Sequence, residues 1–162
     1  MKIIIFSYSL GRPRPDLSAS EKTSIAEVYG EILKSKLESA YEIELIYVES
    51  MDSEDAMFWG QRMVAFREPD VVIFHFGIND CAPRLFRKNS KSIILNSTFR
   101  KLTADLVLRV AGRLRFYITR FRKISYFNST EFIDNIEFLE QEVLKFKPSC
   151  KFYFIGIAES NV

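Results

Sequence analysis

Residues Asp70–Phe76 read DVVIFHF and are followed at once by Gly77–Arg84, GINDCAPR. The first stretch is short, apolar and rich in β-branched residues, which predicts a strand covered on both faces of a sheet. The second begins with glycine, which lets the backbone approach a ligand closely, and contains an uncharged amide donor at Asn79. Together they predict a ligand site where a buried parallel strand ends.

Strands and helices alternate on both sides of this stretch. Further strands are predicted at Lys2–Phe6, Glu42–Val48 and Lys151–Ile157, and helices at Ser18–Ala40, Asp52–Phe66 and Ser129–Phe146. The candidate capping residues of these helices are Ser18 or Ser20, Asp52 or Ser53, and Ser129 or Thr130. Strands joined by helices indicate right-handed crossovers, so the predicted fold is a three-layer α/β/α domain with a parallel sheet.

Composition is ordinary for a soluble globular protein. At 162 residues the chain fits a single domain over residues 1–162, and its net charge of +2 indicates no nucleic-acid partner. No apolar run is long enough to span a membrane, and the N-terminus lacks a secretory pattern, so a cytoplasmic location is expected. Cys81 and Cys150 lie far apart without metal-ligand spacing, which favours two thiols.

Two unusual loops are expected to meet at one edge of the sheet. In a flavodoxin-like order of 2-1-3-4, the first and third strands are neighbours, and the strand order reverses between them. The loops that leave these strands are Ser7–Asp16 and Gly77–Arg84. Ligands bind at such switch points, so these loops are the predicted site.

The motif G-x-N-D after an apolar third strand resembles the third sequence block of the SGNH/GDSL hydrolases. The opening loop aligns with the first block of that family, because Ser7–Leu10 (SYSL) stands where the family has Gly-Asp-Ser-Leu. Pro13 and Arg14 resemble the Pro-Arg that often follows in a bacterial branch. The resemblance runs from the first strand to the fourth and implies ester hydrolysis on a flavodoxin-like fold.

The resemblance implies roles for individual residues. Ser9 would attack an acyl carbonyl, and the backbone N–H of Ser9 and the side chain of Asn79 would donate to the oxyanion. Ser50 stands nearest the second-block glycine that donates a third N–H, with Gly60 as a weaker candidate. Substrate contacts are assigned to Arg14, Gly77 and Arg84. The substrate would be a small-molecule or carbohydrate ester, such as an O-acetyl group, and no metal or cofactor is called for.

Four departures from the family pattern shape the prediction. Ser7 and Tyr8 replace the glycine and aspartate of the first block, and Ser50 replaces the glycine of the second. The Asp-x-x-His block, which supplies the base, is missing, and with it the last strand and helix of the fold. The only histidine, His75, lies inside the third strand and is interpreted as a core or sheet-face residue, with a substitute base as the alternative. The chain is therefore expected to be a shortened or inactive member, with instability, self-association or a partner along its exposed fourth strand.

Other interpretations remain open. Ser9 could be a turn serine and Asn79 an Asx-turn residue, and Asp80 is interpreted as structural. The whole domain could be a non-catalytic binding or scaffold module on the same fold. The stretch Arg109–Lys123 lies within a predicted helical segment, Phe99–Lys123, and is rich in arginine. It could act as a basic interaction module, although a solvated helix face explains it as well.

Overall fold

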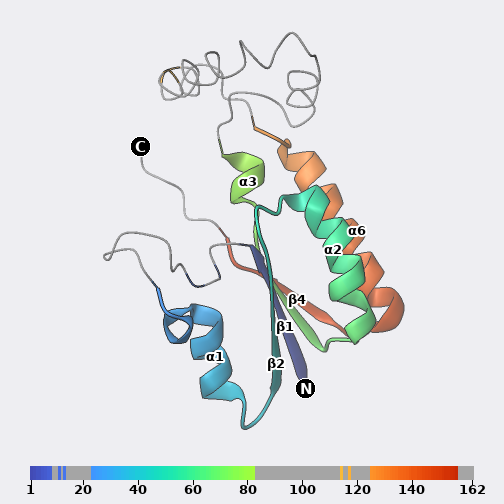
Figure 1. Ribbon diagram of the computed structural model, residues 1–162. Helices are drawn as coiled ribbons and strands as arrows, with labels where there is room; N and C mark the ends of the chain where they lie inside the picture. Colours follow the sequence, from blue (N-terminus) through green and yellow to red (C-terminus); the bar gives the residue numbers. More distant parts are fainter. Residues whose placement is uncertain are drawn as a thin grey trace, which may run out of the picture. The chain divides into compact units, whose positions relative to one another are not determined.

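The structure, a computed structural model, describes residues 1–8, 11, 13, 23–82, 114, 117 and 125–156. The Cα positions group into two compact units, Met1–Asn79 with Thr130–Val162 and Asp80–Ser129. The first unit contains a sheet of parallel strands in the order β2-β1-β3-β4 (Figure 1). This order confirms the predicted flavodoxin-like sheet, whereas the single domain stays a prediction.

The four strands lie where β-branched and aromatic residues cluster in the sequence. They span Lys2–Tyr8 (β1), Glu42–Val48 (β2), Val71–His75 (β3) and Lys151–Phe154 (β4). Only β1 clearly exceeds its predicted range, which ended at Phe6. It continues because Ser7 and Tyr8 pair with the last two residues of β2. Pairing with a neighbouring strand thus extends β1 to the edge of the candidate site.

The helical elements with described bounds are the α-helices Tyr29–Leu37 (α1), Ser53–Met63 (α2), Ile78–Cys81 (α3) and Ser129–Phe146 (α6), and the 3-10 turns Ile25–Glu27 (η2) and Ala65–Arg67 (η3). The bounds of α6 agree with the prediction. Of the predicted helical segment Phe99–Lys123, the structure describes only Leu114 and Tyr117, so that prediction lies outside the described residues.

The first helix begins later than the predicted Ser18. Val28 is extended (φ −73°, ψ 131°) and buried, and it separates η2 from α1. The backbone N–H of Ser24 bonds the carboxylate of Glu27 at 2.6 Å and caps the short turn. Burial of the β-branched Val28 in an extended conformation outweighs the helix propensity around it. The predicted caps Ser18 and Ser20 lie outside the described residues.

The second helix is capped as predicted by Asp52. Its Oδ1 accepts a hydrogen bond from the backbone N–H of Asp55 at 3.0 Å, and the carboxylate of Asp55 accepts in turn from the N–H of Asp52. These two bonds form a capping box. The helix ends at Met63, earlier than predicted, because the chain tightens into η3 and then turns at Glu68 (φ 50°) ahead of Pro69.

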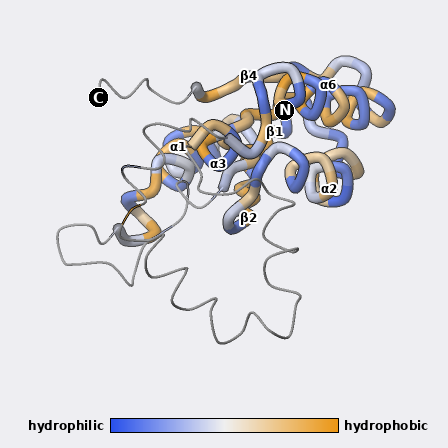
Figure 2. Tube along the Cα trace, turned by 90° about the horizontal axis from the view of Figure 1, so that it is seen from above, coloured by the Kyte–Doolittle hydropathy of each residue, from blue (hydrophilic) through white to orange (hydrophobic). Residues whose placement is uncertain are grey.

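Helices cover both faces of the sheet in this unit (Figure 1). Helix α1 packs on one face, over a cluster that contains Ile3, Ile5 and Ile43. Helices α2 and α6 pack on the other face, where the core is rich in phenylalanine. Phenylalanines of this core that make ring contacts with one another include Phe6, Phe74, Phe76, Phe132, Phe152 and Phe154. The alternation of hydrophobic and hydrophilic residues along α2 and α6 matches this packing (Figure 2).

Helices α2 and α6 approach each other closely at a glycine. A Cβ atom added at Gly60 would lie 2.4 Å from Cδ1 and 3.2 Å from Cγ of Leu139, which is fully buried. Two side-chain hydrogen bonds join the same helices. Asn135 Nδ2 donates to Ser53 Oγ at 2.8 Å, and Gln61 Nε2 donates to Glu142 Oε2 at 2.9 Å. Gly60 therefore serves helix packing, and its helical position argues against the role of oxyanion donor.

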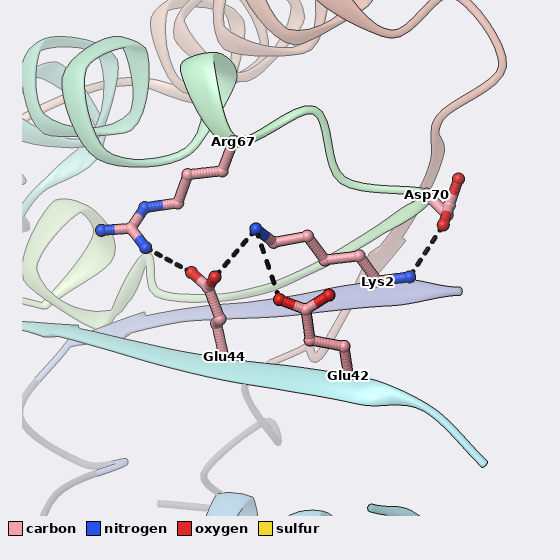
Figure 3. A network of polar contacts seen from close by, with 5 residues as sticks. All are labelled: Lys2, Glu42, Glu44, Arg67 and Asp70. Carbon is pink, nitrogen blue, oxygen red and sulfur yellow. Dashed lines mark hydrogen bonds and ion pairs between the residues drawn. The ribbon is translucent and has the colours of Figure 1, made fainter.

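Charged residues tie the elements together at the amino ends of the strands (Figure 3). Lys2 Nζ lies 2.8 Å from Glu44 Oε1, and Arg67 pairs with the same carboxylate. Burial alone would raise the pKa of Glu44, but the hydrogen bonds from Lys2 and Arg67 lower it below its ordinary value. The carboxylate of Asp70 accepts from the backbone N–H of Lys2 at 2.7 Å and pairs with Lys147. This network lies at the opposite end of the sheet from the predicted site.

Candidate functional site

The carboxyl ends of β1, β2 and β3 carry the loops of the candidate site. Strand β1 lies between β2 and β3, and all three run in parallel, so their carboxyl ends share one edge of the sheet. The chain leaves β1 toward α1 on one face, and it leaves β2 toward α2 on the other (Figure 1). The strand order thus reverses beside β1, as the predicted site requires.

The side chain of Asn79 joins two of these loops. It lies in α3, one short turn after β3, and its Nδ2 donates a hydrogen bond to the carbonyl oxygen of Met51 at 2.9 Å. Met51 is buried and directly follows Ser50 in the loop after β2. The structure therefore brings together the two segments that resemble the second and third family blocks.

Ser50 has the backbone conformation of a glycine position. Its φ is 54°, in the left-handed region, and its side chain is exposed at the end of β2. An L-residue in this region costs roughly 1–2 kcal/mol, and glycine does not. The resemblance places a glycine of the family at this point. The strained serine is thus consistent with a loop shaped for glycine.

Ser50→Gly is expected to raise the free energy of unfolding by about 0.5–1 kcal/mol. The change relieves the left-handed strain, although the larger entropy of glycine in the unfolded chain offsets part of the gain. Urea denaturation monitored by circular dichroism measures the difference. Ser35→Gly is the matched control, because Ser35 is an exposed residue inside α1, where glycine costs about 0.5 kcal/mol. Equal destabilisation by both changes would contradict the expectation.

Gly77 and Gly11 are needed for local geometry. Gly77 has φ 119°, a conformation that only glycine adopts readily, and it turns the chain from β3 into α3. A Cβ atom at Gly11 would lie 2.4 Å from Ser7 Oγ and 3.0 Å from the ring of Tyr47. The loop after β1 therefore packs tightly against the strand ends at Gly11. The predicted contact between Gly77 and a substrate stays a prediction.

Three of the predicted site residues cannot be placed. Ser9, Arg14 and Arg84 lie outside the described residues. Ser9 directly follows Tyr8, the last residue of β1, so the sequence position of the proposed nucleophile is at the carboxyl end of that strand. The basic stretch Arg109–Lys123 also lies outside the described residues, apart from Leu114 and Tyr117, which are exposed.

His75 is a sheet-face residue, as the sequence indicated. Its Nδ1 lies 2.9 Å from the hydroxyl of Tyr29 and 3.4 Å from Ser7 Oγ, on the face that α1 covers. Its ring also makes edge contacts with Tyr8 and Tyr29. Burial lowers the pKa of His75, which favours the neutral ring. His75 therefore links β3 to α1 and β1.

The partners of His75 were missed by sequence reasoning. Ser7 is fully buried and stands opposite His75 in the pairing of β1 with β3. Tyr29 begins α1, and burial raises the pKa of its hydroxyl. One sequence feature could have indicated Ser7: it is a polar residue in a strand whose other buried residues are mostly apolar. Tyr29 has no such signal, because its approach depends on where α1 starts.

Comparison with solved structures identifies the fold. The chain is similar in fold to TesA. The TM-score is 0.55 at 12% sequence identity, and the match covers 98% of this chain. The parallel sheet with flanking helices is thus an α/β fold similar to that of TesA, and the predicted fold class is confirmed. At this identity the likeness shows the fold alone, and this chain spans 62% of the length of TesA.

The sequence was also compared with protein-family profiles and with curated proteins. No protein-family profile matches the chain. No curated protein matches it in sequence either. Within the part of the chain that the structure describes, no helix is long and apolar enough to cross a membrane, and no three His, Cys, Asp or Glu side chains gather to hold a metal ion.

Proposed function

We propose that this chain carries an SGNH-type ester-hydrolase site at the carboxyl ends of β1, β2 and β3. The observation that carries the proposal is the 2.9 Å hydrogen bond from Asn79 Nδ2 to the carbonyl of Met51. This bond holds the Asn79 amide beside the loop that contains Ser50. In the proposed oxyanion hole, the side chain of Asn79 and the backbone N–H of Ser50 donate to the same oxygen, so the two must lie close together. The fold, similar to that of TesA, supports the same reading.

In the proposed reaction, Ser9 Oγ attacks the acyl carbon of an ester and passes its proton to a base. The backbone N–H groups of Ser9 and Ser50 and the side chain of Asn79 stabilise the oxyanion of the tetrahedral intermediate. The alcohol then leaves with a proton, and water hydrolyses the acyl-enzyme. Because Tyr29 and Ser7 engage His75 Nδ1, the proposal does not assign the base to His75.

The proposed substrate is a small-molecule or carbohydrate ester, with an O-acetyl group as the simplest example. Arg14 and Arg84 supply cationic side chains that suit a carboxylate or phosphate on the alcohol part. Gly77 lets the chain turn without a side chain beside the proposed oxyanion donors. This choice of substrate rests on analogy with the family.

A fluorophosphonate probe tests the proposal directly. We expect intact-mass measurement to show one covalent adduct, and peptide mapping to place it on Ser9, with slow hydrolysis of p-nitrophenyl acetate. Ser9→Ala is expected to remove both signals. Ser35→Ala is the control, because Ser35 is exposed on α1, where its hydroxyl donates to the carbonyl of Ile32. It is expected to react like the unchanged chain.

Absence of both the probe adduct and ester hydrolysis would decide against the proposal. An unchanged chain that takes up no probe and leaves p-nitrophenyl acetate intact would overturn the hydrolase proposal. The non-catalytic binding domain on the same fold would then be the better description. An adduct that persists in Ser9→Ala would instead assign the nucleophile to another residue.

A further inference from the structure

Strand β4 lies at the edge of the sheet. It pairs in parallel with β3, from Lys151 opposite Val71 to Phe154 opposite Phe74. Among the described residues, no strand pairs with its other side. Such an edge presents backbone N–H and C=O groups that another strand can bind.

The hydrogen bonds to β3 show which backbone groups face outward. The N–H of Lys151 donates to the carbonyl of Asp70 at 3.0 Å, and the N–H of Ile155 donates to that of Phe74 at 2.8 Å. Hydrogen-bonding direction alternates along a strand. The backbone N–H and C=O groups of Phe152 and Phe154 therefore point to the open edge.

The side chains of this edge are apolar and exposed. Tyr153 is 57% exposed, Phe154 43% and Ile155 37%. Tyr153 projects from one face of β4, and Phe154 projects from the other, where its ring lies 5.9 Å from that of Phe132. Edge strands are usually protected by several charges, proline or bulges, but β4 has only Lys151 as a charged residue.

We propose that β4 pairs antiparallel with β4 of a second copy of this chain, about a two-fold axis at Tyr153. Phe152 then lies opposite Phe154 of the partner, and each such pair exchanges both of its outward backbone hydrogen bonds. Tyr153 faces its own counterpart in the intervening non-hydrogen-bonded pair, where side chains are closest. The two sheets become one continuous sheet.

Charge favours this partner and this direction. The antiparallel pairing places Lys151 opposite Ile155 of the second copy, so the only charged side chain of the strand meets an apolar one. A parallel pairing in register would place Lys151 beside its own counterpart, and like charges directly opposite destabilise a sheet. A two-fold contact also closes on itself, which yields a dimer and no filament.

A pair of substitutions at one position isolates the backbone contribution. Phe154→Ala removes the aromatic ring and keeps the N–H, whereas Phe154→Pro removes the ring and the outward N–H together. Sedimentation of the unchanged chain is expected to show a monomer–dimer equilibrium. We expect Phe154→Pro to weaken dimerisation about tenfold or more beyond Phe154→Ala, because one hydrogen bond is lost from each copy. Circular dichroism checks that both variants remain folded.

A cysteine scan tests the two-fold axis. Tyr153→Cys is expected to form a disulfide across the dimer, because Cα atoms in a non-hydrogen-bonded antiparallel pair lie about 4.5 Å apart. Lys151→Cys is the control, since its counterpart lies roughly four residues away along the strand, beyond the reach of a disulfide. Mapping of the linked peptides separates this bond from any bond to Cys81 or Cys150.

Three results would overturn the dimer. The first is a chain that stays monomeric at all concentrations, with the amides of Phe152 and Phe154 protected from exchange by another part of the same molecule. The second is equal association of Phe154→Pro and Phe154→Ala. The third is a disulfide from Lys151→Cys and none from Tyr153→Cys, which would indicate a parallel contact.

Discussion

Gly60→Ala is expected to lower the free energy of unfolding by about 1–2 kcal/mol, although alanine is the better helix former. Helix propensity alone predicts a gain of about 1 kcal/mol inside α2. The added Cβ would lie 2.4 Å from Leu139 Cδ1 and 2.8 Å from Cδ2, and the Leu139 side chain is fully buried. Overpacking of a core costs typically 1–3 kcal/mol, so we expect the clash to outweigh the propensity.

The sign of the change in the free energy of unfolding shows whether helix propensity or the close contact with Leu139 dominates at Gly60. Urea denaturation of the single and double variants of Gly60→Ala and Leu139→Ala forms a thermodynamic cycle. Leu139→Ala alone is expected to cost about 2–5 kcal/mol because it leaves a cavity. In the double variant the new Cβ fills part of that cavity, so the combined loss should be smaller than the sum. Additive losses, or a gain from Gly60→Ala alone, would refute the close contact between α2 and α6.

The sheet was predictable because each strand carries its own local signal. The runs that became β1 and β3 are short, apolar and β-branched, and the run that became β2 alternates and ends in β-branched residues, so their type was clear from sequence. The start of α1 was not predictable, because it depends on burial of Val28 in an extended conformation. Tertiary packing there overrides a local preference for helix. The short helix α3 was missed because GINDCAPR reads as a loop.

The candidate site was predictable in outline only. Strand order and the G-x-N-D motif indicated the loops after β1 and β3, and the order is confirmed. The bond from Asn79 to Met51 was not predictable, because residue type does not reveal which of many carbonyls an amide will reach. The left-handed conformation of Ser50 was equally hidden from residue type, since serine seldom adopts it.

Asn79→Ala is expected to reduce ester hydrolysis about 10²–10³-fold, if the proposed site is correct. Loss of one oxyanion donor typically costs this much in rate. The structure adds a second consequence, because the same amide donates to Met51. Loss of that hydrogen bond is expected to lower the free energy of unfolding by about 0.5–1.5 kcal/mol. The rate and the stability are therefore measured on the same sample.

Asn79→Asp provides the matched comparison for this experiment. It keeps the size of the side chain, but a carboxylate cannot donate to Met51 and repels a developing oxyanion. We expect it to hydrolyse p-nitrophenyl acetate at least as slowly as Asn79→Ala, with a similar loss of stability. A rate unchanged by both variants, together with lowered stability, would make Asn79 a structural link between two loops and remove it from the proposed oxyanion hole. Because the bond to Met51 exists whether or not the chain is an enzyme, the loss of stability is expected in either case.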